Sequence, residues 1–99
     1  MLHIINKSPF QTSTLDSCLR MAQPGHALLL SEDGIYAATA GSSTEARLRQ
    51  ACTTLKVYAL KPDMDARGVT DKLIEGVTLV DYGGFVDLTV EYKTSHSWL

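Results

Sequence analysis

The residue with the clearest potential for covalent chemistry is Cys18, in the stretch from Asn6 to Ala22. A thiolate is a strong nucleophile, and a helix N-terminus or a nearby cation promotes its formation. Ser13 precedes Asp16 by three residues, the spacing of a capping box, which predicts a helix from about Thr14. Cys18 then lies roughly 7 Å along the helix axis from the cap, where little of the dipole's effect remains.

The same helix also gives Cys18 a structural explanation. Leu15, Leu19 and Ala22 form one apolar stripe, and Cys18 falls inside it. A cysteine on such a stripe behaves as a small buried hydrophobic residue. The pattern favours this structural role, and Cys18 stays the one candidate for a nucleophilic thiol. Cys52 is expected in the core, because no polar turn lies near it.

Other residue types that bind metals or phosphates are scattered along the chain. His3, His26 and His96 lack metal-ligand spacing, whereas a zinc site needs about four ligands. Neither of the two common glycine-rich phosphate-binding patterns occurs. We therefore predict no metal and no cofactor, and a nucleotide-binding flavodoxin-like module is a weak alternative.

Composition and charge narrow the class of protein. The 99 residues are 44% hydrophobic and 20% charged, ordinary values for one globular domain over residues 1–99. The net charge is −2, and the nine lysines and arginines form no basic patch, so direct contact with nucleic acid is not expected. No apolar run approaches the roughly 20 residues of a membrane span, and no signal-peptide pattern is present. We expect a cytoplasmic protein that makes no contact with a membrane.

Short apolar runs separated by turn signals predict a set of buried strands. The run at 27–30 is almost continuously apolar, as expected of a parallel strand that is covered on both faces. Pro24 and Gly25 separate this run from the first helix. The predicted strands are Leu2–Ile5, Ala27–Leu30, Lys56–Leu60 and Val77–Val80.

Helical patterns occupy the segments between these strands. Thr44 is a potential cap for a second helix, and Pro62 begins a short helical turn that ends by Arg67. The segment from 69 to 76 is a weakly helical connection. The apolar stripe of the second helix is Leu48, Ala51, Cys52 and Leu55.

Three segments allow more than one interpretation. Ile35–Thr39, after the turn signal from Glu32 to Gly34, is either a returning strand or a short helix. Phe85 to Tyr92 alternates like a strand, but Asp81 as a cap favours a helix. Ser95 to Leu99 forms a short edge strand or packs Trp98 against a neighbour.

The alternation of strands and helices predicts an α/β fold, with a mainly parallel sheet of four to five strands flanked by helices. In such sheets a functional surface forms outside the carboxyl ends of the strands. Those ends lead into the segments 6–8, 32–34, 61–62 and 81–82.

Several segments together resemble the DsrH/TusB family of sulfur-relay proteins. They follow the family's order over essentially the whole chain, and each segment alone is a weak signal. The matching segments are Asn6–Phe10, Leu15–Ala22, Glu32–Ala38, Lys56–Leu60, Ala66–Gly68, Val80–Tyr82, Phe85–Thr89 and Ser97–Leu99.

The resemblance implies a three-layer DsrE-like fold and a cytoplasmic heterohexamer with two related small α/β subunits, TusC/DsrF-like and TusD/DsrE-like. Such complexes pass persulfide sulfur between protein cysteines and on to a downstream acceptor protein. In one branch the sulfur reaches the 2-thiouridine of the tRNA wobble position, which is the function we expect. In the other branch the complex serves sulfur oxidation.

The resemblance also bears on Cys18. The principal carrier cysteine of such complexes lies on a different subunit, which makes this chain an accessory or assembly subunit more than a catalyst. Cys18 matches the cysteine of DsrH-type members, whereas many members of the tRNA branch lack it, so a DsrH-like part for Cys18 in persulfide transfer is the alternative. A stand-alone α/β ligand-binding module is an alternative of another class.

Overall fold

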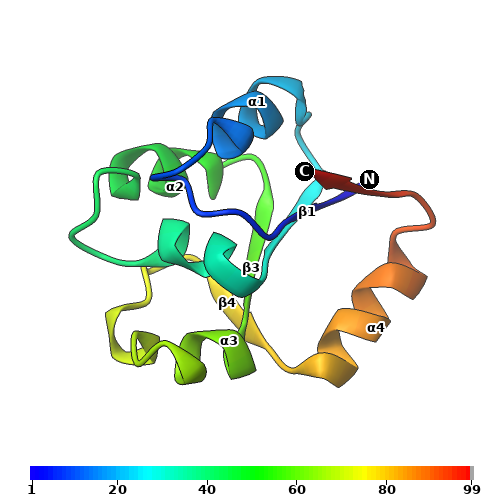
Figure 1. The fold of residues 1–99 in the computed structure, drawn as a ribbon. Helices are drawn as coiled ribbons and strands as arrows, with labels where there is room; N and C mark the ends of the chain where they lie inside the picture. The colour runs from blue at the N-terminus through cyan, green and yellow to red at the C-terminus, as the bar shows by residue number, and fades with distance from the viewer. Residues whose placement is uncertain (99) are drawn as a thin grey trace.

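Five parallel strands form one sheet at the centre of the protein (Figure 1). The computed structural model describes residues 1–98. The order across the sheet is β4-β3-β2-β1-β5, so β2 is the central strand. The strands are β1 (Leu2–Ile5), β2 (Ala27–Leu30), β3 (Lys56–Leu60), β4 (Thr78–Val80) and β5 (Ser95–Trp98).

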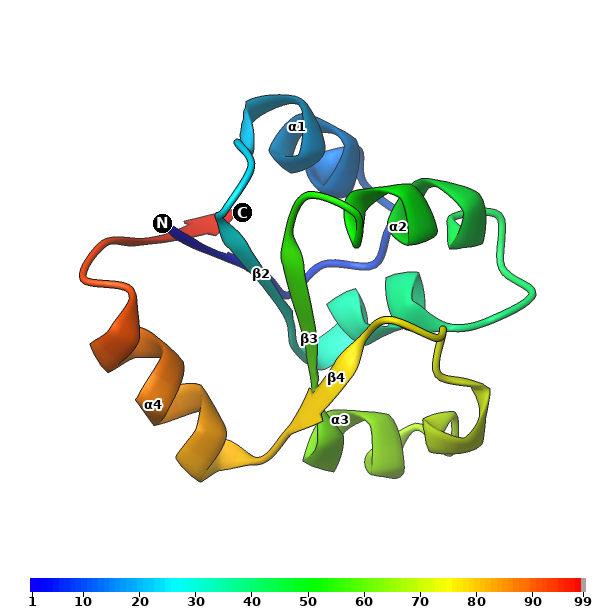
Figure 2. The same ribbon diagram turned by 180° about the vertical axis from the view of Figure 1, so that it is seen from behind.

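Helices cover the two faces of this sheet unequally. The chain steps from β1 to β4 in one direction and then returns to β5 beyond β1. Right-handed crossovers therefore place the helices of the first three connections on one face and the return helix on the other, as Figure 2 shows for α4. The helices are α1 (Thr14–Met21), η1 (Glu32–Ala38), α2 (Glu45–Ala51), α3 (Lys61–Ala66), η2 (Thr70–Lys72) and α4 (Tyr82–Glu91), where η marks a 3₁₀ helix.

The sheet separates two hydrophobic clusters. Leu28 and Leu30 point into the larger cluster, with Leu15 of α1 and Leu48 of α2. The smaller cluster lies under α4 and contains Leu2, Ala27, Leu29 and Leu88. The α/β fold with helices on both faces of a parallel sheet, predicted from the sequence, is confirmed.

The structure decides the three ambiguous segments. The residues at 32–38, including the predicted turn at 32–34, form the 3₁₀ helix η1 and not a returning strand. Tyr82–Glu91 is helical, as the cap at Asp81 favours. Residues 95–98 form the edge strand β5 beside β1, and Trp98 also packs against the larger cluster. Leu99 lies outside the described residues.

Two predicted helix caps are wrong in their chemistry, although both helices begin where expected. The Ser13 side chain makes no capping hydrogen bond, and the Asp16 carboxylate instead pairs with Arg47 of α2. Thr44 precedes α2, but its hydroxyl donates to the Ala37 carbonyl at 3.2 Å. Asp81 does cap α4, because its carboxylate accepts from the Gly84 N–H at 2.7 Å.

Burial of the expected core residues is confirmed at most positions. Leu19 and Val80 are only partly buried and pack at the edges of the two clusters. Cys52, expected in the core, is also only half-buried, because it lies at the C-cap of α2. The fully or nearly fully buried positions are Leu15, Leu28, Leu29, Leu30, Leu48, Val57 and Leu60.

Truncation of Leu29 to alanine should measure the strength of packing in the smaller cluster. Leu29 has no exposed surface, so Leu29→Ala leaves a cavity and should lower the free energy of unfolding by about 2–5 kcal/mol. Urea denaturation followed by circular dichroism measures the change. Val90→Ala on α4 is the control, because Val90 is 73% exposed and should change stability little. Equal losses for the two variants would contradict this account of the core.

Candidate functional site

Cys18 lies inside the protein, on the side of α1 that faces the sheet. Its side chain has no exposed surface and belongs to the larger hydrophobic cluster, with Leu15 one turn earlier in the helix. Burial raises the pKa of the Cys18 thiol to about 12, because the apolar surroundings disfavour the thiolate. In this conformation Cys18 is a protonated thiol without access to a sulfur donor.

The second cysteine, Cys52, is closer to the surface. It is half-buried, and burial raises its pKa, while the positive charge of Arg49 acts in the opposite direction with a smaller effect. Both cysteines are free thiols. Neither therefore has the depressed pKa that characterises a reactive cysteine.

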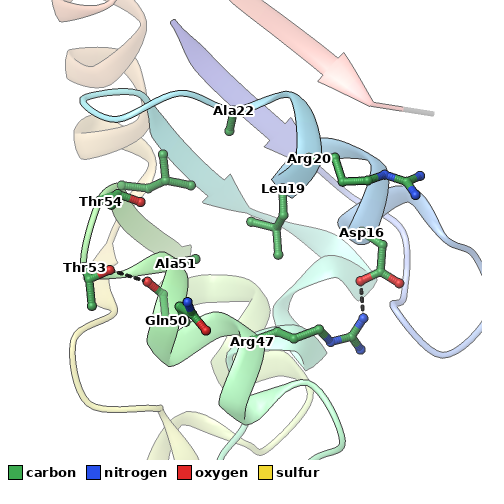
Figure 3. A pocket seen from close by; sticks show the side chains of 10 residues that line it. Asp16, Leu19, Arg20, Ala22, Arg47, Gln50, Ala51, Thr53 and Thr54 are labelled. Carbon is green, nitrogen blue, oxygen red and sulfur yellow. Dashed lines mark hydrogen bonds and ion pairs between the residues drawn. The ribbon is translucent and has the colours of Figure 1, made fainter.

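A hollow opens between α1 and α2 (Figure 3). Some of its lining residues are close to Cys18 in sequence, but Cys18 itself does not line it. Its volume is about 420 Å³, and Leu19 points into it from α1. The ion pair between Asp16 and Arg47 joins the two helices at one end. The remaining lining residues are Arg20, Ala22, Gln50, Ala51, Thr53, Thr54 and Leu55.

The carboxyl ends of β2 and β3 carry a network of charged side chains. Arg67, just after α3, donates to the Asp33 carboxylate at 3.0 Å and lies 3.9 Å from that of Asp63. Asp63 in turn accepts from the backbone N–H of Glu32 at 2.7 Å. These contacts fasten η1 to α3. The carboxylates of Asp33 and Asp63 are therefore engaged within the chain at this end of the sheet.

Gly34 and Asn6 mark the place where β1 ends against η1. A Cβ on Gly34 would collide with the Ile5 carbonyl oxygen, so only glycine permits this approach of η1 to β1. The Asn6 side-chain oxygen is buried and has no hydrogen-bond partner among residues 1–98. The start of the segment predicted to be functional at this end of β1 is thus closely packed against η1, whereas Lys7 is exposed.

The three histidines, which lack metal-ligand spacing in the sequence, lie close together in the structure. His3 and His26 are hydrogen-bonded, and His96 lines the same hollow of about 340 Å³. Within residues 1–98 no group of three or more His, Cys, Asp or Glu side chains is placed to hold a metal ion. No helix in the same part of the chain is both long and apolar enough to cross a membrane.

Solved structures define the class of fold to which this arrangement belongs. The YchN protein from Escherichia coli superposes with a TM-score of 0.84 at 21% identity, covering 98% of this chain and 97% of the other. A protein of unknown function from Methanobacterium thermoautotrophicum gives 0.76 at 18% identity, covering 97% and 95% of the two chains. The protein is a small α/β protein of the fold seen in YchN.

Sequence comparison identifies the family within that fold. The family model described as DsrH like protein matches residues 7–95. Protein TusB from Pectobacterium parmentieri is 42% identical over 99% of this chain and 100% of its own length. Protein TusB from Escherichia coli K12 is 40% identical with the same coverage. The chain belongs to the DsrH/TusB family, as the segments compared above predict.

Alkylation should distinguish the two cysteines. At pH 8 a thiol with a pKa of about 12 is ionised in roughly one molecule in 10⁴, and Cys18 is also inaccessible. Iodoacetamide should therefore modify Cys52 first in the folded chain, as read by mass spectrometry of the peptides. Both cysteines should react at similar rates in urea, which is the control. Faster modification of Cys18 in the folded chain would show that it is not the buried thiol described here.

Proposed function

We propose that this protein is the subunit of a cytoplasmic sulfur-relay complex that does not hold the principal carrier cysteine, and that the complex passes persulfide sulfur towards 2-thiouridine at the tRNA wobble position. Similarity to TusB proteins over 99% of the chain is the observation that carries this proposal. The acidic net charge of −2 supports delivery to tRNA through a downstream acceptor protein, without direct contact with the nucleic acid.

The outer side of α4 supports a role in an assembly. Tyr82, Val86 and Val90 succeed one another at four-residue intervals, so they form one stripe along the helix. Their exposed fractions are 62%, 58% and 73%, large values for apolar side chains. Contiguous exposed apolar surface of this kind is typical of protein interfaces. We infer that a related small α/β subunit, TusC/DsrF-like or TusD/DsrE-like, covers this stripe in a heterohexamer.

Three other large apolar side chains, Phe10, Phe85 and Trp98, differ in their exposure. Phe10 is 56% exposed, in the turn before α1. Phe85 and Trp98 are half-buried, because Phe85 packs against the smaller cluster and Trp98 against the larger one. The stripe on α4 is therefore the better candidate for the contact with another subunit.

Cys18 has a secondary place in the proposed function. Its burial within the larger cluster supports a packing role, with the carrier cysteine on a partner subunit. The alternative is a DsrH-like subunit of a sulfur-oxidation complex, in which Cys18 takes part in persulfide transfer. That alternative requires α1 to move so that the thiol becomes accessible.

A charge placed on the α4 stripe should disrupt assembly. Val90→Asp puts a carboxylate at the position with the largest exposed fraction, so the chain should fold but lose most co-purification with its two related subunits. Asp87→Ala is the matched control, an exposed change on the same helix outside the stripe, and it should co-purify normally. Undiminished co-purification of Val90→Asp would place the interface elsewhere.

Deletion and complementation should test the pathway and the role of Cys18. Loss of the gene should abolish most 2-thiouridine in tRNA, as measured by nucleoside mass spectrometry. The wild-type gene and Cys18→Ser should both restore it, because the proposal places the carrier cysteine on a partner. Unchanged 2-thiouridine after deletion would contradict the tRNA branch. A Cys18→Ser chain that assembles but restores no 2-thiouridine, with persulfide on Cys18 of the wild type, would make Cys18 a carrier.

A further inference from the structure

Two histidines and the single tryptophan form a continuous chain of hydrogen bonds beside the edge strand β5. The Trp98 indole N–H donates to Nδ1 of His3 at 3.1 Å. Nε2 of His3 lies 3.0 Å from Nδ1 of His26. The backbone N–H of Gln23 donates to the same Nδ1 of His26 at 3.2 Å. This His3–His26–Trp98 chain joins β1, the loop before β2 and the C-terminal strand, where the two ends of the protein lie side by side (Figure 1).

The two outer groups fix the positions of the protons between them. An indole N–H and a backbone N–H can only donate, so Nδ1 of His3 and Nδ1 of His26 must both accept. The hydrogen bond between the imidazoles then requires the proton to be on Nε2 of His3. Two independent donors thus impose the same state, in which both imidazoles are neutral.

A further proton on His3 would have no acceptor. The open position on its ring is Nδ1, and there the added N–H would face the Trp98 indole N–H. His3 is 3% exposed, so its ring offers almost no surface on which water could replace the lost hydrogen bond. Protonation of His3 therefore breaks the chain of hydrogen bonds.

The surrounding groups oppose protonation as well. Burial lowers the pKa of His3, and a positive charge on His26, the amino terminus or His96 acts in the same direction. These groups come from the loop before β2, from Met1 just ahead of β1, and from β5. Met21 of α1 and Gln23 complete the hollow at this site, and the described residues that line it include no carboxylate.

The edge strand has few other side-chain contacts to hold it. β5 pairs only with β1, and Ser95, His96 and Ser97 are exposed. Trp98 is the residue of β5 that packs against the larger cluster. We propose that the His3–His26–Trp98 chain is a proton-operated latch, which holds β5 on β1 while the His3 imidazole is neutral and releases the strand when His3 takes up a proton.

The direction of the pH effect follows from the lowered pKa of His3. A histidine that resists protonation in the folded chain contributes stability that is present above its unfolded value of 6.5 and is lost as the pH falls below it. Release remains local, because β1 also pairs with β2 along Leu2–Ile5. The latch therefore frees one edge of the sheet and leaves its centre intact.

Because the chain has a single tryptophan, its intrinsic fluorescence reports on Trp98 in the unmodified protein. As the pH is lowered from about 8 to about 5, across the usual range of histidine, Trp98 emission should shift to longer wavelength. Amide exchange should show loss of protection in β5 with protection retained in β2. Long-range ¹⁵N NMR at the higher pH should show the Nε2–H tautomer of His3. A protonated Nδ1 of His3 at that pH, or β5 protection that persists through the His3 titration, would overturn the proposal.

Variants separate the latch from general acid sensitivity. His96→Gln removes a neighbouring imidazole but none of the hydrogen-bonded groups, so the transition should persist. His3→Gln should abolish the transition. Should that chain fail to fold, Trp98→Phe removes the opposing N–H, and the NMR titration midpoint of His3 should rise. An unchanged midpoint in Trp98→Phe, or simultaneous loss of β2 and β5 protection in the wild type, would contradict the latch.

Discussion

Burial of the central strand β2 between two unlike helical layers is the constraint on which the rest of the structure depends. All four of its side chains have no exposed surface, and successive side chains enter opposite clusters. A strand buried on both faces needs helices on both faces. The chain supplies them by stepping in one direction through three crossovers and returning once through α4. One face therefore receives several helices, whereas the other receives a single helix.

Much of this architecture could be predicted from the sequence, because its determinants are local. The apolar run at 27–30 and the breaker at Pro24 and Gly25 define the central strand without reference to the rest of the chain. The failures concern side chains whose partners are distant in sequence. Asp16 matches a capping box, yet its carboxylate pairs with Arg47, 31 residues away. The spacing of Ser13 and Asp16 cannot show that a distant arginine competes for the carboxylate of Asp16.

The same distinction applies to the candidate sites. The apolar stripe of α1 correctly indicated the burial of Cys18, because the helical period alone determines which side faces the sheet. His3 and His26 are separated by 23 positions, and His3 and Trp98 by 95. The first hydrogen bond depends on the alignment of β1 with β2, and the second on the parallel register of β1 and β5, which places Ile5 opposite Trp98. Parallel alignment of the two ends of the chain could not be inferred from residue spacing.

The unequal layers also explain why one helix carries apolar residues on opposite sides. Leu88 of α4 packs on the sheet, while Val86 and Val90 of the same helix point outward. Among residues 1–98, the single return crossover leaves the outer side of this helix uncovered. In the proposed assembly, another subunit covers these valines. The face with several helices instead buries the thiol of Cys18, so the surface suited to a partner and the sulfur atom lie on opposite sides of the sheet.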